Sequence, residues 1–357
     1  MITFPSGRLL RIAAAAAAAA ALGMPAGAAP QTIEQALADR FGLTAAERNT
    51  IAGGFEAARA LPSAAPDGVA VIGAIRIDAR PSVYLRWAET GVDFDRSAAV
   101  QAVRRLSDPP VLADFDFLTL SAEEVIELAR CRIGACALQL DAGSISRVAA
   151  IDWRRPRAGA EATAIVRETM LDVAERYLAS GNAGLPHYHD ARRHTDVEEN
   201  LASLVEEEAA CGRMPEPLLA ALSGHPRELP PEATGYLSWM THGFGPGPTT
   251  RLNHTIVYRG EGELAGVVAT KQLYASHYLH GGLEMRYVLA DPLRDDRFVL
   301  VMVSRARSDG LTGVAGAIVG NTIRRGALHS LRAQLRFTRD AVEKRQRAGG
   351  TPPAAGR

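Results

Sequence analysis

The sequence predicts an α+β fold in which an antiparallel sheet is wrapped on one long C-terminal helix, with a helical insertion ahead of the main run of strands. Two observations support this prediction. Between residues 236 and 303, five segments have the alternating or β-branched pattern of strands and are separated by short turns. Residues 311–345 then form one continuous segment without proline, in which apolar residues recur at helical spacing.

The first part of the chain predicts helices around one buried strand. Residues 32–61 have helical periodicity. Residues 69–79 form a β-branched apolar run, which is typical of a strand buried on both faces. Ser121 and Glu124 have the spacing of a capping box and predict a helix at residues 118–131.

The middle of the chain predicts the helical insertion. Residues 160–180 have an amphipathic helical pattern, and Thr195 and Glu198 form a second capping-box spacing. Residues 215–231 are rich in proline and polar residues, which favours a linker. The expected segments are a leader (1–28), an N-terminal helical segment (29–64), the first part of the α+β domain (65–154), the insertion (155–231), the strands with the long helix (232–346) and a disordered tail (347–357).

Five strands are expected after the insertion, at residues 236–244, 251–259, 266–278, 283–289 and 298–303. The second of them alternates most clearly. Leu252, His254 and Ile256 should share one face, and Asn253 and Thr255 the other.

The leader has the three parts of a secretory signal peptide. Arg8 and Arg11 supply positive charge, residues 12–24 are uncharged and alanine-rich, and small residues precede a cleavage site near Ala28. The apolar run is shorter than the roughly 20 residues that span a bilayer, although a retained anchor is the alternative. We therefore expect a cleaved, soluble, periplasmic protein.

Charge and motifs exclude several function classes. The chain has 40 basic and 40 acidic residues, so no net charge attracts nucleic acid. It contains neither GxxxxGK[ST] nor GxGxxG after a predicted strand, and export removes a protein from cytoplasmic nucleotide pools. We therefore expect no nucleic-acid partner and no cofactor.

Two cysteines are spaced for a disulfide. Cys131 and Cys136 flank a turn at Gly134, and an oxidising compartment favours bridging them. The bridge would join a helix end to a short strand at residues 136–140, and two buried free thiols are the alternative. Cys211 is expected to be a small core residue.

Histidines cluster in one loop. His187, His189 and His194 lie close together with Asp190, and two histidines two residues apart could share a metal if the segment were a strand. The segment lies between two predicted helices and lacks HExxH, so a hydrogen-bonded loop is favoured and no metal is expected.

Residues 267–281 combine an apolar strand with many polar groups. Tyrosines offer an apolar ring and a hydrogen-bonding tip, which suits a mixed ligand pocket. If the strand continues, Gln272, Tyr274 and Tyr278 share one face. The alternative is an exposed hairpin face. The expected ligand-binding residues are Trp239, Lys271, Gln272, Tyr274, His277, Tyr278 and Tyr287.

A hydrolase is the rival hypothesis. Ser276 and His277 are adjacent, and on a strand they would point to opposite faces, which argues against direct activation of the serine. No GxSxG elbow is present. An exported hydrolase would depend on some of the chain's histidines: His187, His189, His254 and His277.

The long C-terminal helix has an unusual composition. Gly313, Gly316 and Gly320 would let a sheet or a ligand approach closely, at a cost of roughly 1 kcal/mol each against alanine. Its second half is basic and amphipathic, which is compatible with transient contact with an anionic membrane, although a solvated arginine face is the alternative. The arginines expected at such a contact are Arg324, Arg325, Arg332 and Arg336.

The strand-then-helix pattern resembles the START-like (SRPBCC) helix-grip domains. The resemblance rests on VIGAIRIDARPSVYLRW at residues 71–87, where a strand ends in an alanine–proline region that enters a short helix. It extends over residues 69–87 and 236–345 and does not cover residues 155–231. It implies a curved sheet around the last helix, with space for an apolar ligand between them.

A second resemblance covers most of the chain. The motifs CRIGAC, YLSW, ATKQLYASHY and SRARSDGL are similar to those of a group of uncharacterised exported bacterial proteins. In that group the first motif is closer to CRVGDC, so Ala135 departs from it. The resemblance implies export and carries no activity to this chain.

These observations together predict a periplasmic binding or carrier protein for an apolar or amphipathic molecule of lipid or isoprenoid type. The exported hydrolase is one alternative. A non-catalytic envelope scaffold, with side chains filling the space beneath the long helix, is another.

Overall fold

The computed structural model describes residues 32–91, 93–94, 100–244, 247–308, 311 and 313–349. The predicted leader lies outside the described residues, as does the predicted tail beyond residue 349. The predictions of a signal peptide and of a disordered tail therefore remain predictions.

Eight strands form one antiparallel sheet in the order β1-β2-β10-β9-β8-β7-β6-β3. From β6 to β10 each strand pairs with the next along the chain, and β10 then pairs with the much earlier β2. The strands are β1 (Ala57–Leu61), β2 (Gly68–Ile77), β3 (Val100–Arg105), β6 (Ala233–Phe244), β7 (Gly247–Arg259), β8 (Leu264–Ala275), β9 (Leu279–Asp291) and β10 (Arg294–Ser308).

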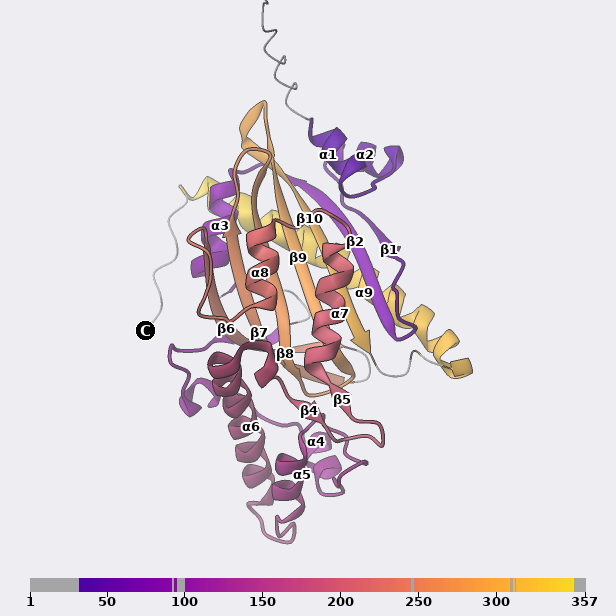
Figure 1. Cartoon of the computed structure of the whole chain (residues 1–357), viewed down its shortest axis with the longest axis vertical. Coiled ribbons are helices and arrows are strands. Elements are labelled where there is room, and N and C mark those ends of the chain that lie inside the picture. Colours follow the sequence, from indigo (N-terminus) through magenta and orange to yellow (C-terminus); the bar gives the residue numbers. More distant parts are fainter. Residues whose placement is uncertain are drawn as a thin grey trace, which may run out of the picture. The chain divides into compact units, whose positions relative to one another are not determined.

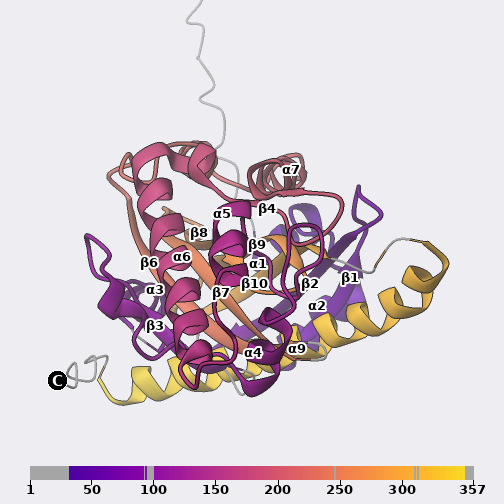
Figure 2. The ribbon, with the colours of Figure 1, turned by 90° about the horizontal axis from the view of Figure 1, so that it is seen from below.

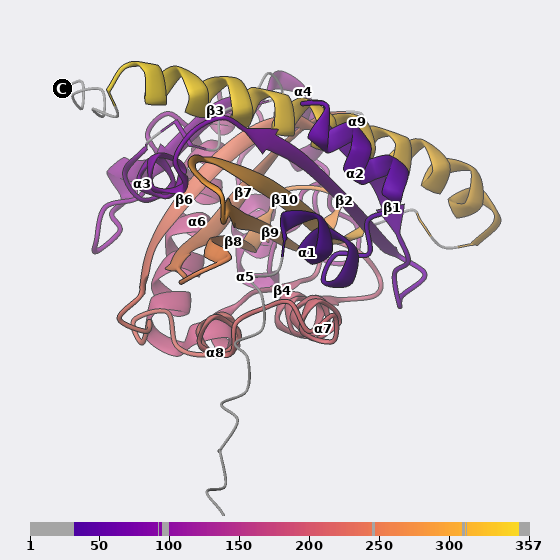
Figure 3. The ribbon, with the colours of Figure 1, turned by 90° about the horizontal axis from the view of Figure 1, so that it is seen from above.

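One face of the sheet is covered by α9 (Gly313–Arg347) and α3 (Pro81–Thr90). Figure 3 shows α9 running across this face, opposite α7 and α8. Its apolar stripe packs Leu331 and Leu335 into a cluster with Val71, Ile75 and Leu300 of the sheet. The predicted α+β class, antiparallel sheet and long C-terminal helix are therefore confirmed. The sheet does not curl around α9, which packs mainly on β1, β2 and β10.

The opposite face is covered by the helices of the predicted insertion. These are α6 (Ala158–Ser180), α7 (Val197–Ala209) and α8 (Glu216–Ser223), and Figures 1 and 2 show them on the far side of the sheet from α9. Shorter helices add to the same core, namely α1 (Ile33–Asp39), α2 (Ala45–Ala52), α4 (Ala122–Leu128) and α5 (Ala142–Ala149). The two sheet faces thus have separate apolar clusters.

The expected linker at residues 215–231 was wrong in part, because it contains α8. Leu218 and Leu222 of this helix are fully buried in the core. Pro215 lies at the N-cap and Pro217 in the first turn, where the missing amide hydrogens cost no helical hydrogen bond. Proline here marks the start of a helix rather than a break.

Two further assignments were wrong. Residues 57–61 form edge strand β1 rather than helix, because pairing with β2 overrides the helix preference of alanine. Residues 136–140 form no strand: Cys136 N donates to Asp190 O, and Gln139 N donates to Ser276 O. Strand β3 and helix α5 were not predicted.

Helix boundaries follow the predicted caps closely. Ser121 and Glu124 form the predicted capping box of α4. Helix α6 ends at Gly181, whose φ of 62° favours glycine. The N-cap of α7 is Asp196, which accepts from Glu199 N at 3.0 Å, one residue later than the predicted pair.

Candidate functional site

A pocket of about 190 Å³ lies between the sheet and α9. It is placed at the end of the sheet where β9 begins and β10 ends, which is the lower end of β10 in Figure 1. The volume is below the roughly 300–1,000 Å³ of sites for drug-sized molecules, so the pocket fits a smaller ligand.

The pocket has an apolar side and a polar side. The apolar side comes from β2, β10 and α9 and includes Val71, Met302, Ile323, Ala327 and Leu331. The polar side includes charged and polar residues of the central strands β7, β8 and β9, namely Arg251, Asn253, Thr270, Glu284 and Arg286, and further polar residues of the lining come from β6, β10 and α9. An amphipathic molecule would contact both sides at once.

Strand alternation places the polar groups. As predicted, Asn253 faces away from His254 and Ile256, and it lines the pocket. Ser238 pairs directly with Asn253 in the ladder between β6 and β7, so the two side chains share the face toward α9. The polar half of the pocket is therefore built into the sheet rather than carried by loops.

Asn253 is oriented by Arg251. A guanidinium nitrogen of Arg251 donates to Asn253 Oδ1 at 3.2 Å, which leaves the amide nitrogen as a donor. Asn253 is fully buried, and its Nδ2 has no hydrogen-bond partner among the described residues. Ser238 Oγ and Thr249 Oγ1 are also buried, and neither has a hydrogen-bond partner in the part of the chain that the structure covers. Leaving a buried polar group without a hydrogen bond lowers the free energy of unfolding by about 1–3 kcal/mol.

Among the described residues, the charged side chains that line the pocket are Arg251, Glu284 and Arg286. Glu284 and Arg286 form an ion pair, and the Arg286 guanidinium lies 4.8 Å from the Phe94 ring centroid. Burial, with the charge of Arg251 as a smaller contribution, lowers the pKa of His242 to about 3. His242 is therefore neutral at pH 7.

Four of the expected ligand residues lie on the other face of the sheet. Trp239, Lys271, Tyr274 and Tyr287 belong to the side covered by α6, α7 and α8, and none of them lines the pocket. Trp239 is fully buried and its Nε1 donates to Asp114 O at 2.8 Å. These side chains act as core residues in the structure.

A bulge separates Gln272 from Tyr274. In the β7–β8 ladder Asn253 pairs with Gln272 and Leu252 with Tyr274, so Leu273 is an extra residue. Gln272 faces α9, and its Nε2 donates to the backbone oxygen of Leu279, which lines the pocket. Tyr274 instead packs edge-on against Tyr188 on the other face. The expectation that Gln272 and Tyr274 share one face was therefore wrong.

Lys271 is the most unusual of the core residues. It is fully buried, its Nζ donates at 2.9 Å to both Asn182 Oδ1 and Leu222 O, and it lies 5.0 Å from the Tyr177 ring centroid. Burial lowers the pKa of Lys271 to about 7. Burial, with the charge of Lys271, also lowers the pKa of His254 to about 3, and Tyr177 Oη bonds His254 Nδ1 at 2.6 Å.

Tyr287 belongs to a buried charge network between the sheet and α7. Its hydroxyl donates to Glu208 Oε1 at 2.7 Å, and Arg213 and Arg305 also bind Glu208. Burial alone would raise the pKa of Glu208. The charge and hydrogen bonds of Arg213, together with a hydrogen bond from Arg305, outweigh the effect of burial, so the pKa of Glu208 is lowered. The network is a structural one that holds α7 against β9 and β10.

Ser276 and His277 contact each other, contrary to prediction. Strand β8 ends at Ala275, so the alternation on which the prediction rested does not continue. Ser276 Oγ and His277 Nδ1 are 2.8 Å apart, while Ser276 Oγ also accepts from Thr250 N at 2.9 Å. Burial lowers the pKa of His277. Tyr278 follows with a φ of 59°, in the turn into β9.

The histidine loop forms its own contacts. The rings of His189 and His194 are in tilted contact, with 4.1 Å between their centroids, and His187 Nδ1 lies 3.5 Å from Asp196 Oδ2. Within the described residues no group of three or more His, Cys, Asp or Glu side chains is arranged to hold a metal ion. The histidines proposed for a hydrolase fall into separate sets: this loop, the Tyr177–His254 pair and the Ser276–His277 pair.

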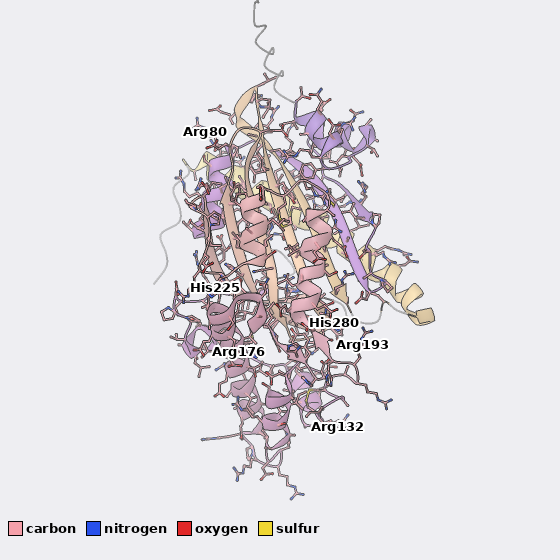
Figure 4. The ribbon with its side chains drawn as sticks, in the orientation of Figure 1. Arg80, Arg132, Arg176, Arg193, His225 and His280 are labelled. Atoms are coloured by element: carbon pink, nitrogen blue, oxygen red, sulfur yellow. A yellow bond between two sulfur atoms is a disulfide. The ribbon has the colours of Figure 1, made fainter. Side chains whose placement is uncertain are left out.

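The predicted disulfide between Cys131 and Cys136 is confirmed. The turn that it closes binds the histidine loop, since Gly134 N donates to His189 O at 2.7 Å. Arg132 in this turn is labelled in Figure 4, in the lower part of the view, where Figure 1 labels α4 and α5. Cys211 is exposed, so its assignment to the core was wrong.

Two of the four arginines expected at a membrane are used within the protein. Arg332 donates to Ala58 O of edge strand β1 at 3.0 Å, and Arg336 pairs with Glu56, the residue that precedes β1. Arg325 is exposed and Arg324 is half-buried. Among the described residues, no helix is long and apolar enough to cross a membrane.

Comparison of the sequence with protein-family models and with curated proteins finds no match. Both resemblances drawn from the sequence therefore remain predictions. What the chain does has to be inferred from the pocket.

Proposed function

We propose that the chain is a binding or carrier protein for a small amphipathic molecule, held in the pocket between the sheet and α9. The observation that carries this proposal is the two-sided lining, with Asn253 Nδ2 buried on the polar side and apolar residues of α9 opposite. The pocket favours a carrier over a scaffold with a filled interior.

The strand order supports a START-like helix-grip relationship. In the sheet, the last strand before the long helix pairs with the strand that precedes the short helix α3, and the ligand site of such a domain would lie beneath the long helix. The pocket occupies that place. Its volume favours a short-chain molecule over a long isoprenoid.

The predicted leader supports a periplasmic location for this carrier. A soluble carrier of that kind meets the membrane transiently. Arg324 and Arg325 on α9 are the arginines that we propose for the contact, since Arg332 binds Ala58 of β1 and Arg336 pairs with Glu56.

Native mass spectrometry of the protein purified from its own compartment tests the proposal. We expect a bound mass that solvent extraction removes. Ala327→Phe fills the pocket from α9 and should abolish the bound mass, whereas His329→Phe, on the exposed side of the same helix, should retain it. A clean apo mass with nothing extracted would overturn the proposal.

A hydrolase remains the second candidate, because Ser276 Oγ and His277 Nδ1 are in hydrogen-bond contact. Short-chain p-nitrophenyl esters test it. Turnover that is lost in Ser276→Ala and kept in Ser330→Ala would support the hydrolase, and equal rates in both variants would exclude a role for this serine.

A further inference from the structure

The apolar wall of the pocket ends where the apolar cluster beneath α9 begins. Leu331 of α9, Met302 of β10 and Val71 of β2 line the pocket and also pack in this cluster. Leu335 lies one turn further along α9, and Leu300 is the next residue on the same face of β10. Both are fully buried in the cluster, and neither is among the described residues that line the pocket. On its apolar side the pocket therefore ends against packed side chains.

Burial increases along the α9 wall toward Leu331. Ile323 and Ala327 line the pocket two turns and one turn earlier and are half-buried, whereas Leu331 is 5% exposed. One turn beyond it, Leu335 packs against Gly73 of β2, where an added Cβ would lie 2.9 Å from Leu335 Cδ1. The helix and the sheet are thus in direct contact just past Leu331.

Strand β10 has its boundary at the same level. Ala306 and Ser304 line the pocket along one face of the strand, and Met302 is the last described residue on that face to do so. Met302 pairs with Gly73, the residue against which Leu335 packs. The helix wall and the sheet wall therefore reach the solid core together.

The volume of the pocket limits the apolar part of a ligand. An apolar protein cavity of about 150 Å³ holds benzene, which has six carbon atoms. In proportion, the pocket volume of about 190 Å³ accommodates about eight carbon atoms.

We propose that Leu331 is a specificity-determining residue, which limits the apolar chain of the ligand to about eight carbon atoms. Its side chain occupies the space into which a longer chain would extend, between the pocket and the cluster. This role rests on the proposed function, and it names the length of chain that the same pocket accepts.

A homologous series of primary alcohols, from 1-butanol to 1-dodecanol, measures the length limit by isothermal titration calorimetry. Each methylene that enters the pocket should raise the affinity about fourfold. In the wild type the rise should stop at about 1-octanol, because further methylenes stay in water. The hydroxyl of an alcohol both donates and accepts hydrogen bonds, so the series assumes nothing about the natural head group.

Three variants of the α9 wall should move this limit. Leu331→Ala removes three carbon atoms and should extend the rise to about 1-undecanol, with a gain of up to about 60-fold for that alcohol over the wild type. Leu331→Val removes one carbon atom and should extend the rise to about 1-nonanol, which keeps the test available if the alanine variant does not fold. Ala327→Leu adds three carbon atoms to the same wall and should stop the rise at about 1-pentanol.

Leu335→Ala is the matched control. It removes the same three carbon atoms from the same cluster, one turn along the helix, at a residue outside the described lining of the pocket. Thermal unfolding should show a loss of stability in both alanine variants, since both leave a cavity in the core. The limit in Leu335→Ala should nevertheless remain at about 1-octanol.

The outcomes separate the role of Leu331 from the carrier proposal. If the wild-type affinity rises through 1-dodecanol, if both Leu331 variants keep the wild-type limit, or if Leu335→Ala moves the limit as far as Leu331→Ala does, the role of Leu331 is overturned and the carrier proposal stands. If no alcohol binds and no molecule is extracted from the purified protein, the carrier proposal itself fails.

Discussion

Replacing Lys271 by methionine should remove the rise in stability that we expect between pH 7 and pH 9. The chain has two lysines, Lys271 and Lys344, and the first is fully buried. Burial lowers its pKa from 10.5 to about 7 in the folded state. The unfolded chain therefore binds more protons than the folded one across this window, so stability falls as the pH falls and rises as the pH rises.

The magnitude follows from the size of this shift. One proton bound in the unfolded state alone corresponds to about 1.4 kcal/mol per pH unit. Because folded Lys271 is half-protonated at pH 7, the gain from pH 7 to pH 9 comes to about 2 kcal/mol. Burial raises the pKa of Tyr177, so this side chain stays protonated in the folded state when the tyrosines of the unfolded chain begin to ionise above pH 9. Above pH 9 this difference lowers the stability as the pH rises, opposite to the effect of Lys271.

Urea unfolding at pH 7, 8 and 9 measures the effect. The wild type and Lys344→Met, which removes the lysine near the end of α9, should show the same upward slope. Lys271→Met should show a flat profile. A flat wild-type profile, or an unchanged slope in Lys271→Met, would refute the assignment of a depressed pKa to this lysine.

Four further results are expected. The free energy of unfolding should fall by up to about 2.7 kcal/mol per pH unit between pH 6 and pH 4, because His242 and His254 stay neutral in the folded state and are protonated in the unfolded state. Chemical denaturation of His254→Asn should show about half that slope. Replacing both Cys131 and Cys136 by alanine should cost about 2 kcal/mol of unfolding free energy, the entropic value for so short a loop, and no loss would show that the bridge is dispensable. Arg324→Glu with Arg325→Glu should weaken flotation with anionic vesicles and leave the melting temperature unchanged; equal flotation would reject this surface. Arg336→Gln should instead lower the melting temperature, because its ion pair joins α9 to Glu56 ahead of β1, and an unchanged value would contradict that role.

The sequence predicted regular elements well where one physical signal dominates. The alternation at residues 251–259, the capping box of Ser121 and Glu124, and the long apolar stripe of α9 each correspond to the observed element. Edge strand β1 was missed because its alanines favour helix locally and only the partner strand β2 makes it extended. Such pairing between distant segments is not encoded in local periodicity.

The pocket was harder to predict than the fold. Tyrosine content drew attention to Tyr274 and Tyr287, but the bulge at Leu273 and the strand register place both against the helices of the other face. The better signal was the polar run Arg251, Asn253 and Thr255 on one face of an otherwise apolar strand, since a buried polar stripe must find partners. Its partner Ser238 becomes visible only through the β6–β7 register.

The most direct test of the pocket as the ligand site is a titration of isotope-labelled protein with octanoate, followed by NMR of side-chain amides. Asn253 lines the pocket, whereas Trp239 Nε1 donates to Asp114 O on the opposite face and serves as an internal control. We predict a saturable shift of the Asn253 amide signals with the Trp239 indole signal unmoved. A shift of the indole signal alone, or no saturable shift at either group, would contradict the placement of the ligand beneath α9.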